Sequence, residues 1–130
     1  MQIAVRYYSR SGNTKAVADA IAEEAGVKAV SVGADEAGLS EPADVLFIGG
    51  ALYAYGLDRR LSEYLKNLKA DDAKKAVVFS TSWLSRHSVD LIKKGLTEAG
   101  IPVEQEYNYA KNRPSAEQLE EAKRFARKFL

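Results

Sequence analysis

Hydroxyl side chains gather around a glycine directly after the first apolar segment of the sequence. Ser9, Ser11 and Thr14 supply the hydroxyls, and Gly12 lets the backbone wrap closely around a ligand. A helix that begins near Asn13 would direct its free N–H groups and the positive end of its dipole at this loop. The combination favours a bound phosphate group. The loop matches neither the GxxxxGK[ST] pattern of a Walker A loop nor the GxGxxG pattern of a dinucleotide-binding loop.

Two later segments, 51–56 and 80–84, combine small residues and hydroxyls with aromatic rings. Tyr53, Tyr55 and Trp83 are flat side chains that could form the walls of a site for a planar ring. Simpler alternatives remain open for all three segments. A Ser/Gly/Asn/Thr cluster often forms only a turn with a helix cap, and loop tyrosines often pack back on the protein.

A regular alternation of strands and helices is needed to bring these three loops together. Apolar and β-rich runs predict five strands, and residues that recur at helical spacing predict four or five helices, the last of which begins with a capping box. The stretch between the second and third strands is expected to be mostly loop with one helical turn. Such an alternation predicts an open, mostly parallel α/β sheet, which binds ligands beyond the carboxyl ends of its strands. The predicted strands are 2–8, 27–32, 44–50, 74–80 and 101–109, and the predicted helices are 14–25, 57–68, 88–99 and 115–129.

The composition is that of one ordinary domain, and it excludes several kinds of chemistry. The 130 residues are 46% hydrophobic and carry 19 Lys+Arg against 18 Asp+Glu, with one histidine and no cysteine. A thiolate nucleophile, a Cys-ligated metal and a multi-histidine site are therefore impossible. The net charge of +1 gives no basic excess for nucleic acid. Without an apolar run of about 20 residues or a signal-peptide pattern, no membrane span is expected, and we expect a cytoplasmic protein.

Four stretches of the sequence resemble those of flavodoxins, and the likeness covers nearly the whole chain. YYSRSGNT resembles their phosphate loop, a T/S-x-T/S-G-N-T pattern after the first strand. IGGALYAYG and FSTSW are similar to the two loops that enclose the isoalloxazine ring, and NRPSAEQLEEAKRFARKF is similar to the last helix of short bacterial flavodoxins. The resemblance implies a flavodoxin-like three-layer sandwich: a five-stranded parallel sheet of order 2-1-3-4-5 with helices on both faces.

The resemblance also implies non-covalently bound FMN and a role in carrying electrons between redox partner proteins. The chain is then expected to be a monomer or a weak dimer. By this resemblance the FMN phosphate is held by Ser9, Arg10, Ser11, Gly12, Asn13 and Thr14. The ribityl chain and the ring are held by Ala51, Leu52, Tyr53, Ala54, Tyr55, Gly56, Ser80, Thr81, Ser82 and Trp83.

Two features depart from the family's usual pattern. Electron-transfer flavodoxins are typically acidic, whereas this chain is neutral and has Asp58 followed at once by Arg59 and Arg60. A basic rim would steer partners with acidic docking faces, so the two arginines are expected to help set docking. Arg6 lies within the first predicted strand, where an arginine is costly unless paired. We expect it to face a carboxylate at the end of the strand.

Other functions remain open beside the carrier role, which we favour over catalysis. IGGALYAYGLDRRLSEYL and FSTSWLSR are also similar to flavodoxin-like protoporphyrinogen oxidases, although this chain lacks the additional segment that those enzymes carry before the last helix. One alternative is therefore an FMN-dependent oxidoreductase that acts on a quinone or a porphyrin. The other is a flavodoxin-like domain without flavin that serves as an interaction module. The hydroxyls around His87 are better explained by helix capping than by catalysis.

Overall fold

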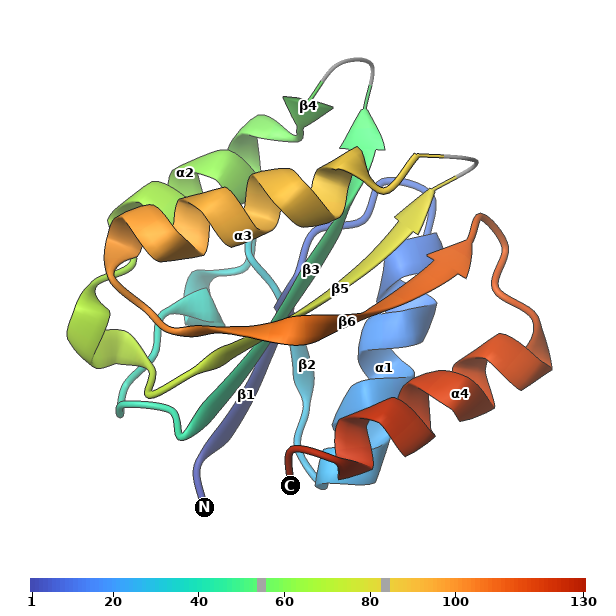
Figure 1. Cartoon of the computed structure of the whole chain (residues 1–130), viewed down its shortest axis with the longest axis horizontal. Coiled ribbons are helices and arrows are strands. Elements are labelled where there is room, and N and C mark those ends of the chain that lie inside the picture. The colour runs from blue at the N-terminus through green and yellow to red at the C-terminus, as the bar shows by residue number, and fades with distance from the viewer. Residues whose placement is uncertain (54–55, 83–84) are drawn as a thin grey trace.

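A five-stranded parallel sheet forms the centre of the computed structural model, which describes residues 1–53, 56–82 and 85–130 (Figure 1). Its strands lie in the order β2-β1-β3-β5-β6, which is the predicted order 2-1-3-4-5 once the short strand β4 is set aside. The predicted fold class and strand order are confirmed. The five strands are β1 (Ile3–Tyr7), β2 (Ala29–Ser31), β3 (Val45–Tyr53), β5 (Ala76–Ser82) and β6 (Val103–Lys111).

The ends of the two central strands differ from the sequence-based prediction. β3 and β5 continue beyond residue 50 and residue 80, with Ala51 paired to Thr81 in the parallel register. The prediction of loops at 51–53 and 80–82 was therefore wrong. A strand between two neighbours keeps its hydrogen-bonded ladder even where small and hydroxyl residues suggest a loop. β4 (Gly56–Leu57), which was not predicted, folds back antiparallel on the end of β3.

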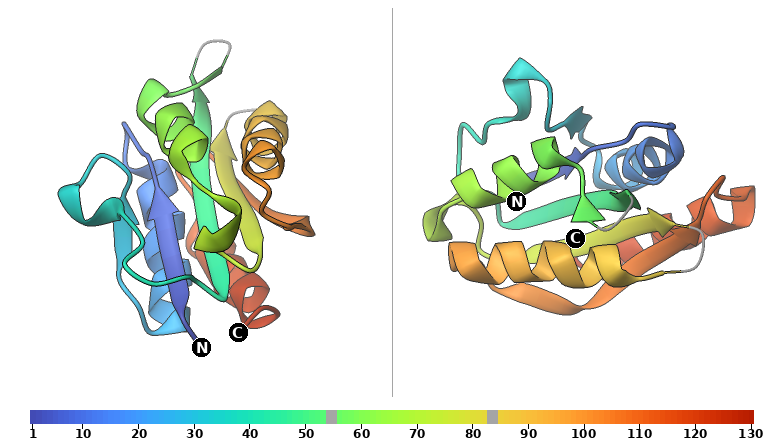
Figure 2. Two further views of the ribbon diagram at one scale, coloured as in Figure 1. Left: turned by 90° about the vertical axis from the view of Figure 1, so that its left-hand side faces the viewer. Right: turned by 90° about the horizontal axis from the view of Figure 1, so that it is seen from above.

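Two pairs of helices cover the two faces of the sheet (Figure 2). The helices α1 (Asn13–Ala25) and α4 (Ala116–Arg127) pack on one face, and α2 (Arg59–Asn67) and α3 (His87–Ala99) pack on the other. All four agree with the predicted helices within two residues at each end, and α2 begins two residues late because Leu57 belongs to β4. Among the described residues, no helix is both long and apolar enough to cross a membrane.

Arg6 in β1 is paired with backbone oxygens. Its Nε donates to the carbonyl of Ala37 over 2.8 Å, and its Nη1 donates to the carbonyl of Val5 over 3.1 Å. Ala37 belongs to the 3-10 turn η1 (Asp35–Ala37), which confirms the helical turn predicted between the second and third strands. The expectation of a carboxylate partner was wrong, because the guanidinium is bonded to the carbonyls of Ala37 in the overlying connection and of Val5 in β1 itself. A second 3-10 turn, η2 (Ala70–Asp72), was not predicted.

Candidate functional site

The described parts of the three segments selected from the sequence meet at the carboxyl ends of β1, β3 and β5. They enclose a cavity of about 500 Å³, within the usual size range of small-molecule and cofactor sites. Part of each segment contributes to its lining. Ala54, Tyr55 and Trp83 lie outside the described residues. The cavity is lined by Ser11, Asn13, Ala51, Leu52, Tyr53, Ser82, Ser85 and Asn112.

The loop between β1 and α1 has the conformation of an anion site. Gly12, the residue before α1, has φ +93° and ψ −6°, a region that favours glycine. Its N–H donates to Ser9 Oγ over 3.0 Å, which closes the loop on itself. The first N–H groups of a helix have no intrahelical acceptor, and here Ser11 Oγ accepts only the Asn13 N–H, over 3.5 Å. The loop is largely exposed, and Ser11 and Asn13 line the cavity, so its hydroxyl and N–H groups are accessible to an anion.

Thr14 and Thr81 lie beneath this loop and join it to the sheet. Their side chains are 1% and 0% exposed, and the two hydroxyl oxygens are 2.7 Å apart. Ser80 is also fully buried, and its hydroxyl donates to the carbonyl of Gly50 over 2.8 Å. These three hydroxyls are hydrogen-bonded within the protein, so they position the loop and the strand ends rather than line the cavity. Of the three hydroxyl residues at the end of β5, Ser82 lines the cavity.

Arg10 connects the loop between β1 and α1 to the β3–β4 hairpin. Its backbone N–H donates to the Tyr53 hydroxyl over 3.0 Å, and its guanidinium lies 4.0 Å from the centre of the Tyr53 ring. The same guanidinium donates to Asp58 Oδ2 from Nε over 3.1 Å and from Nη2 over 2.7 Å. Burial raises the pKa of the Tyr53 hydroxyl, so this hydroxyl remains protonated near neutral pH. The two loops are therefore held to each other by one side chain.

Asp58 was not among the predicted site residues, yet its carboxylate anchors both Arg10 and α2. It is 4% exposed, and its Oδ1 accepts the backbone N–H of Arg60 over 2.8 Å as the N-cap of the helix. Burial alone would raise its pKa, but the hydrogen bonds from Arg10 and from Arg60 outweigh burial and hold the pKa of Asp58 below its usual range. The sequence signal was an aspartate just before a helix, a typical N-cap. Its pairing with Arg10, 48 residues away, had no local signal.

The basic rim expected from Arg59 and Arg60 is partly neutralised within the protein. Arg60 donates from Nη1 to the Tyr8 hydroxyl over 2.6 Å and lies 3.8 Å from Asp58. Arg59 is 86% exposed and lies 3.8 Å from Glu63 in the next turn of α2. Arg59 therefore projects into solvent, whereas Arg60 packs against the first strand's end.

Ser85 and Asn112 line the cavity but were missing from the predicted set. Asn112 follows β6, so its position at the same edge of the sheet follows from the parallel topology. Tyr109 of β6 donates its hydroxyl to the Ser82 carbonyl over 3.2 Å. Arg86 lies 4.6 Å from the centre of the Tyr109 ring. β6 thus supports the site at one side.

Replacing Asp58 with asparagine should change how stability depends on pH. Asparagine retains the helix cap but cannot make the charge-assisted bonds to Arg10. Because the pKa of Asp58 is lowered in the folded protein, its stabilisation is complete above the unfolded pKa of about 3.9 and is lost as pH falls through the folded pKa. We expect Asp58→Asn to lower the free energy of unfolding by about 1 kcal/mol near pH 7, and the deficit to shrink toward pH 3.

Urea unfolding between pH 3 and pH 7 tests this prediction, and Asp44→Asn is the matched control. Hydrogen bonds from the Gln2 N–H and from Lys74 also lower the pKa of Asp44, which lies far from the cavity. Both variants should lose the part of the free energy of unfolding that declines as the pH falls. Only Asp58→Asn should also alter ligand binding at the cavity. A constant difference between Asp58→Asn and the unsubstituted protein at every pH would contradict the assigned role.

Comparison with known proteins identifies the family. The family model described as the flavodoxin domain matches residues 4–126. The chain belongs to the flavodoxin family. The structure of a flavodoxin from the domain Archaea matches with a TM-score of 0.85 and 22% identity, over 99% of this chain and 96% of that one. Oxidised flavodoxin 1 from Bacillus cereus matches with a TM-score of 0.81 and 21% identity, over 99% and 97%.

The same fold also occurs as one part of larger proteins. Rubredoxin oxygen:oxidoreductase from Desulfovibrio gigas matches with a TM-score of 0.82 and 20% identity, over 98% of this chain and 34% of that one. No curated protein sequence matches the chain. At these identities the structural matches establish the fold, and the family match establishes the flavodoxin assignment.

FMN is the cofactor that membership in the flavodoxin family implies, and the cavity suits it. The loop with positive φ at Gly12 presents hydroxyls and helix N–H groups for a phosphate. The adjoining lining from Ala51 to Tyr53 supplies small and aromatic side chains beside which a planar ring can lie. The residues present therefore fit the cofactor at both its phosphate and its ring.

Proposed function

We propose that this flavodoxin carries electrons between redox partner proteins by means of FMN bound in the cavity at the carboxyl ends of β1, β3 and β5. The observation that supports this most directly is that one cavity combines features suited to a phosphate with features suited to a planar ring. An exposed glycine-centred loop at a helix N-terminus adjoins a lining of small and aromatic residues. Bound FMN supplies the redox chemistry, accepting and donating one or two electrons.

The protein's own residues bind and orient the cofactor in this proposal. Ser9, Ser11 and the N-terminus of α1 hold the phosphate, and Arg10 fixes the hairpin against that loop. The segments 51–56 and 80–83 enclose the ribityl chain and the ring, as the resemblance implies. Thr14 and Thr81 act from beneath by keeping α1 at a fixed distance from β5.

The partner face is proposed to lie beside the hairpin, at the start of α2. Arg59 projects into solvent there, so a partner with an acidic docking face fits this edge. Association should then weaken as salt is added, because exposed charges are screened. The proposal retains the cytoplasmic location expected from the sequence.

Titration of the purified apoprotein with FMN and with riboflavin tests the proposed function. Quenching of flavin fluorescence reports binding, and riboflavin lacks only the phosphate. We expect FMN to bind at least about a hundredfold more tightly, because several hydrogen bonds to a charged phosphate contribute about 1.5 to 3 kcal/mol each. Equal affinity would contradict the phosphate loop, and a protein that binds neither flavin would favour the interaction-module alternative.

A matched pair of serine variants separates the site from general stability. Ser11→Ala removes a hydroxyl that lines the cavity, and Ser115→Ala removes the N-cap hydroxyl of α4, which accepts the Gln118 N–H over 3.1 Å. FMN affinity should fall in the first variant and stay unchanged in the second. Rapid turnover of the FMN-loaded protein with a quinone or a porphyrinogen, without any protein partner, would instead support the oxidoreductase alternative.

A further inference from the structure

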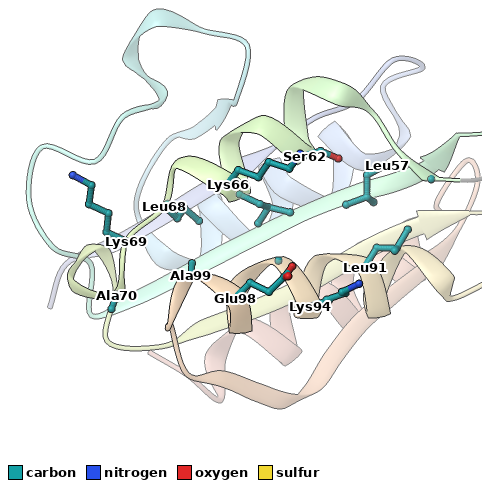
Figure 3. A pocket seen from close by; sticks show the side chains of 13 residues that line it. Leu57, Ser62, Lys66, Leu68, Lys69, Ala70, Leu91, Lys94, Glu98 and Ala99 are labelled. Carbon is teal, nitrogen blue, oxygen red and sulfur yellow. The ribbon is translucent and has the colours of Figure 1, made fainter.

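A second hollow lies between α2 and α3, away from the phosphate loop (Figure 3). We call it the α2–α3 groove. Its volume of about 840 Å³ exceeds that of the FMN cavity and is large enough for a small molecule. It is lined by Gly56, Leu57, Ser62, Leu65, Lys66, Leu68, Lys69, Ala70, Leu91, Lys94, Gly95, Glu98 and Ala99.

Apolar side chains from both helices and from β4 form the floor of the groove. Leu65 and Leu68 are almost fully buried, while Leu57, Leu91 and Ala99 are half-buried and so present apolar surface to the hollow. Gly95 carries no side chain, and a Cβ at that position would lie 3.0 Å from Leu65 Cδ1. The absence of a side chain there leaves the groove open above Leu65. The floor therefore suits an apolar body rather than a polar one.

The rim of the groove is predominantly positive. Lys66 and Lys69 come from α2 and its end, and Lys94 comes from α3, with Glu98 as the one carboxylate of the lining. The ion pairs found within the described ranges include none of these four side chains, whereas most other lysines are paired. Three ammonium groups against one carboxylate leave a net charge of +2 around an apolar floor. This charge is complementary to an anion.

We propose that the α2–α3 groove binds an amphipathic anion: a single carboxylate on an unbranched apolar chain. The chain lies on the leucines, and the carboxylate is held by Lys66 and Lys94, whose flexible stems reach over the apolar floor. From Leu91 to Ala99 the helix advances about 12 Å, which sets the length of chain that the groove accommodates. The site is separate from the FMN cavity and does not depend on the proposed electron-carrier function.

The groove reaches the hairpin of the FMN site at one end. Gly56 and Leu57 line the groove, and as β4 they pair with Tyr53 and Leu52 of β3, both of which line the FMN cavity. A ligand in the groove therefore contacts the strand that holds this wall of the FMN cavity. If the ligand binds one arrangement of the hairpin better, it changes FMN affinity, and FMN changes the ligand's affinity by the same factor.

Calorimetric titration of the full chain with decanoate tests the proposal, both as apoprotein and in the presence of saturating FMN. Decanol has the same chain without charge, and decyltrimethylammonium has the same chain with the opposite charge. We expect saturable binding of one decanoate, at least about tenfold weaker binding of decanol, and no binding of the cation. Decanoate binding to the apoprotein requires no flavin. Titrating the apoprotein as well as the FMN-saturated protein therefore tests the groove independently of the outcome of the FMN titration.

Three variants locate the site. Lys66→Glu combined with Lys94→Glu should weaken decanoate at least about tenfold, whereas Lys28→Glu, an exposed lysine after α1, should leave the affinity unchanged. Ala99→Trp should block the groove by filling it, with thermal unfolding as the check that the variant is folded. The proposal is overturned if decanoate does not saturate, if decanol binds equally well, or if the charge reversals at positions 66 and 94 have no effect.

Discussion

Replacing Gly49 with alanine should lower the free energy of unfolding by about 3 kcal/mol or more. Gly49 lies in β3, between Tyr7 of β1 and Phe79 of β5. A Cβ at this position would lie 2.3 Å from two ring carbons of Phe79 and 2.5 Å from its carbonyl oxygen. The ring belongs to a fully buried side chain and the oxygen to the backbone of a central strand, so neither can move away cheaply. Urea unfolding monitored by circular dichroism measures the loss.

Gly50→Ala is the matched control for this substitution. A Cβ at Gly50 would meet Leu61 Cδ2 at 2.4 Å, which is the far end of a flexible side chain, and the nearest backbone atom, the Tyr8 carbonyl oxygen, is 4.0 Å away. Rotation of Leu61 can relieve that contact, so we expect a loss of about 1 kcal/mol. Equal losses in the two variants would show that Phe79 does not pack over Gly49 as described.

Gly12→Val should damage the phosphate loop and with it the preference for FMN over riboflavin. A β-branched residue strongly disfavours the φ of +93° found at Gly12, at a cost of about 2 to 3 kcal/mol. Since the position of a Cβ has no neighbour within 4 Å, the cost comes from the backbone alone. If the loop relaxes to negative φ, FMN affinity should fall by roughly tenfold to a hundredfold, while riboflavin affinity changes little because it has no phosphate.

Gly12→Asn is the control, because asparagine adopts left-handed backbone conformations more readily than valine. It should retain most of the FMN affinity and most of the stability. Urea unfolding of the Gly12→Val variant should be measured together with the two titrations. If valine keeps the positive φ, the backbone cost appears as lost stability and not as lost FMN affinity. If valine altered neither stability nor FMN affinity, the loop conformation assigned to Gly12 would be incorrect.

The order of the elements could be read from the sequence, because each depends on short-range patterns. Apolar runs mark the strands, and helical spacing and the Ser115 capping box mark the helices. The ends of β3 and β5 could not be read in this way. Small and hydroxyl residues at 51–53 and 80–82 resemble a loop in isolation, and only pairing with neighbouring strands makes them strand.

Within the candidate site, the sequence alone was enough to predict the glycine-centred loop between β1 and α1. A glycine among hydroxyls between a strand and a helix is a local arrangement, and Gly12 has the positive φ such a loop requires. It also placed the three segments at one edge of the sheet, because the carboxyl ends of parallel strands meet there. The family match over residues 4–126 supports FMN, the cofactor that the resemblance to flavodoxins implied.

Which side chains pair across the chain became visible only in the folded structure. The bond from Arg10 to Asp58, the burial of Thr14 against Thr81, and the carbonyl partners of Arg6 all join segments distant in sequence. The α2–α3 groove likewise exists only because two helices from separate segments pack side by side. Periodicity fixes which face of an element is apolar, but contacts between elements depend on their packing distances and on the register of the sheet, which no short window of sequence contains.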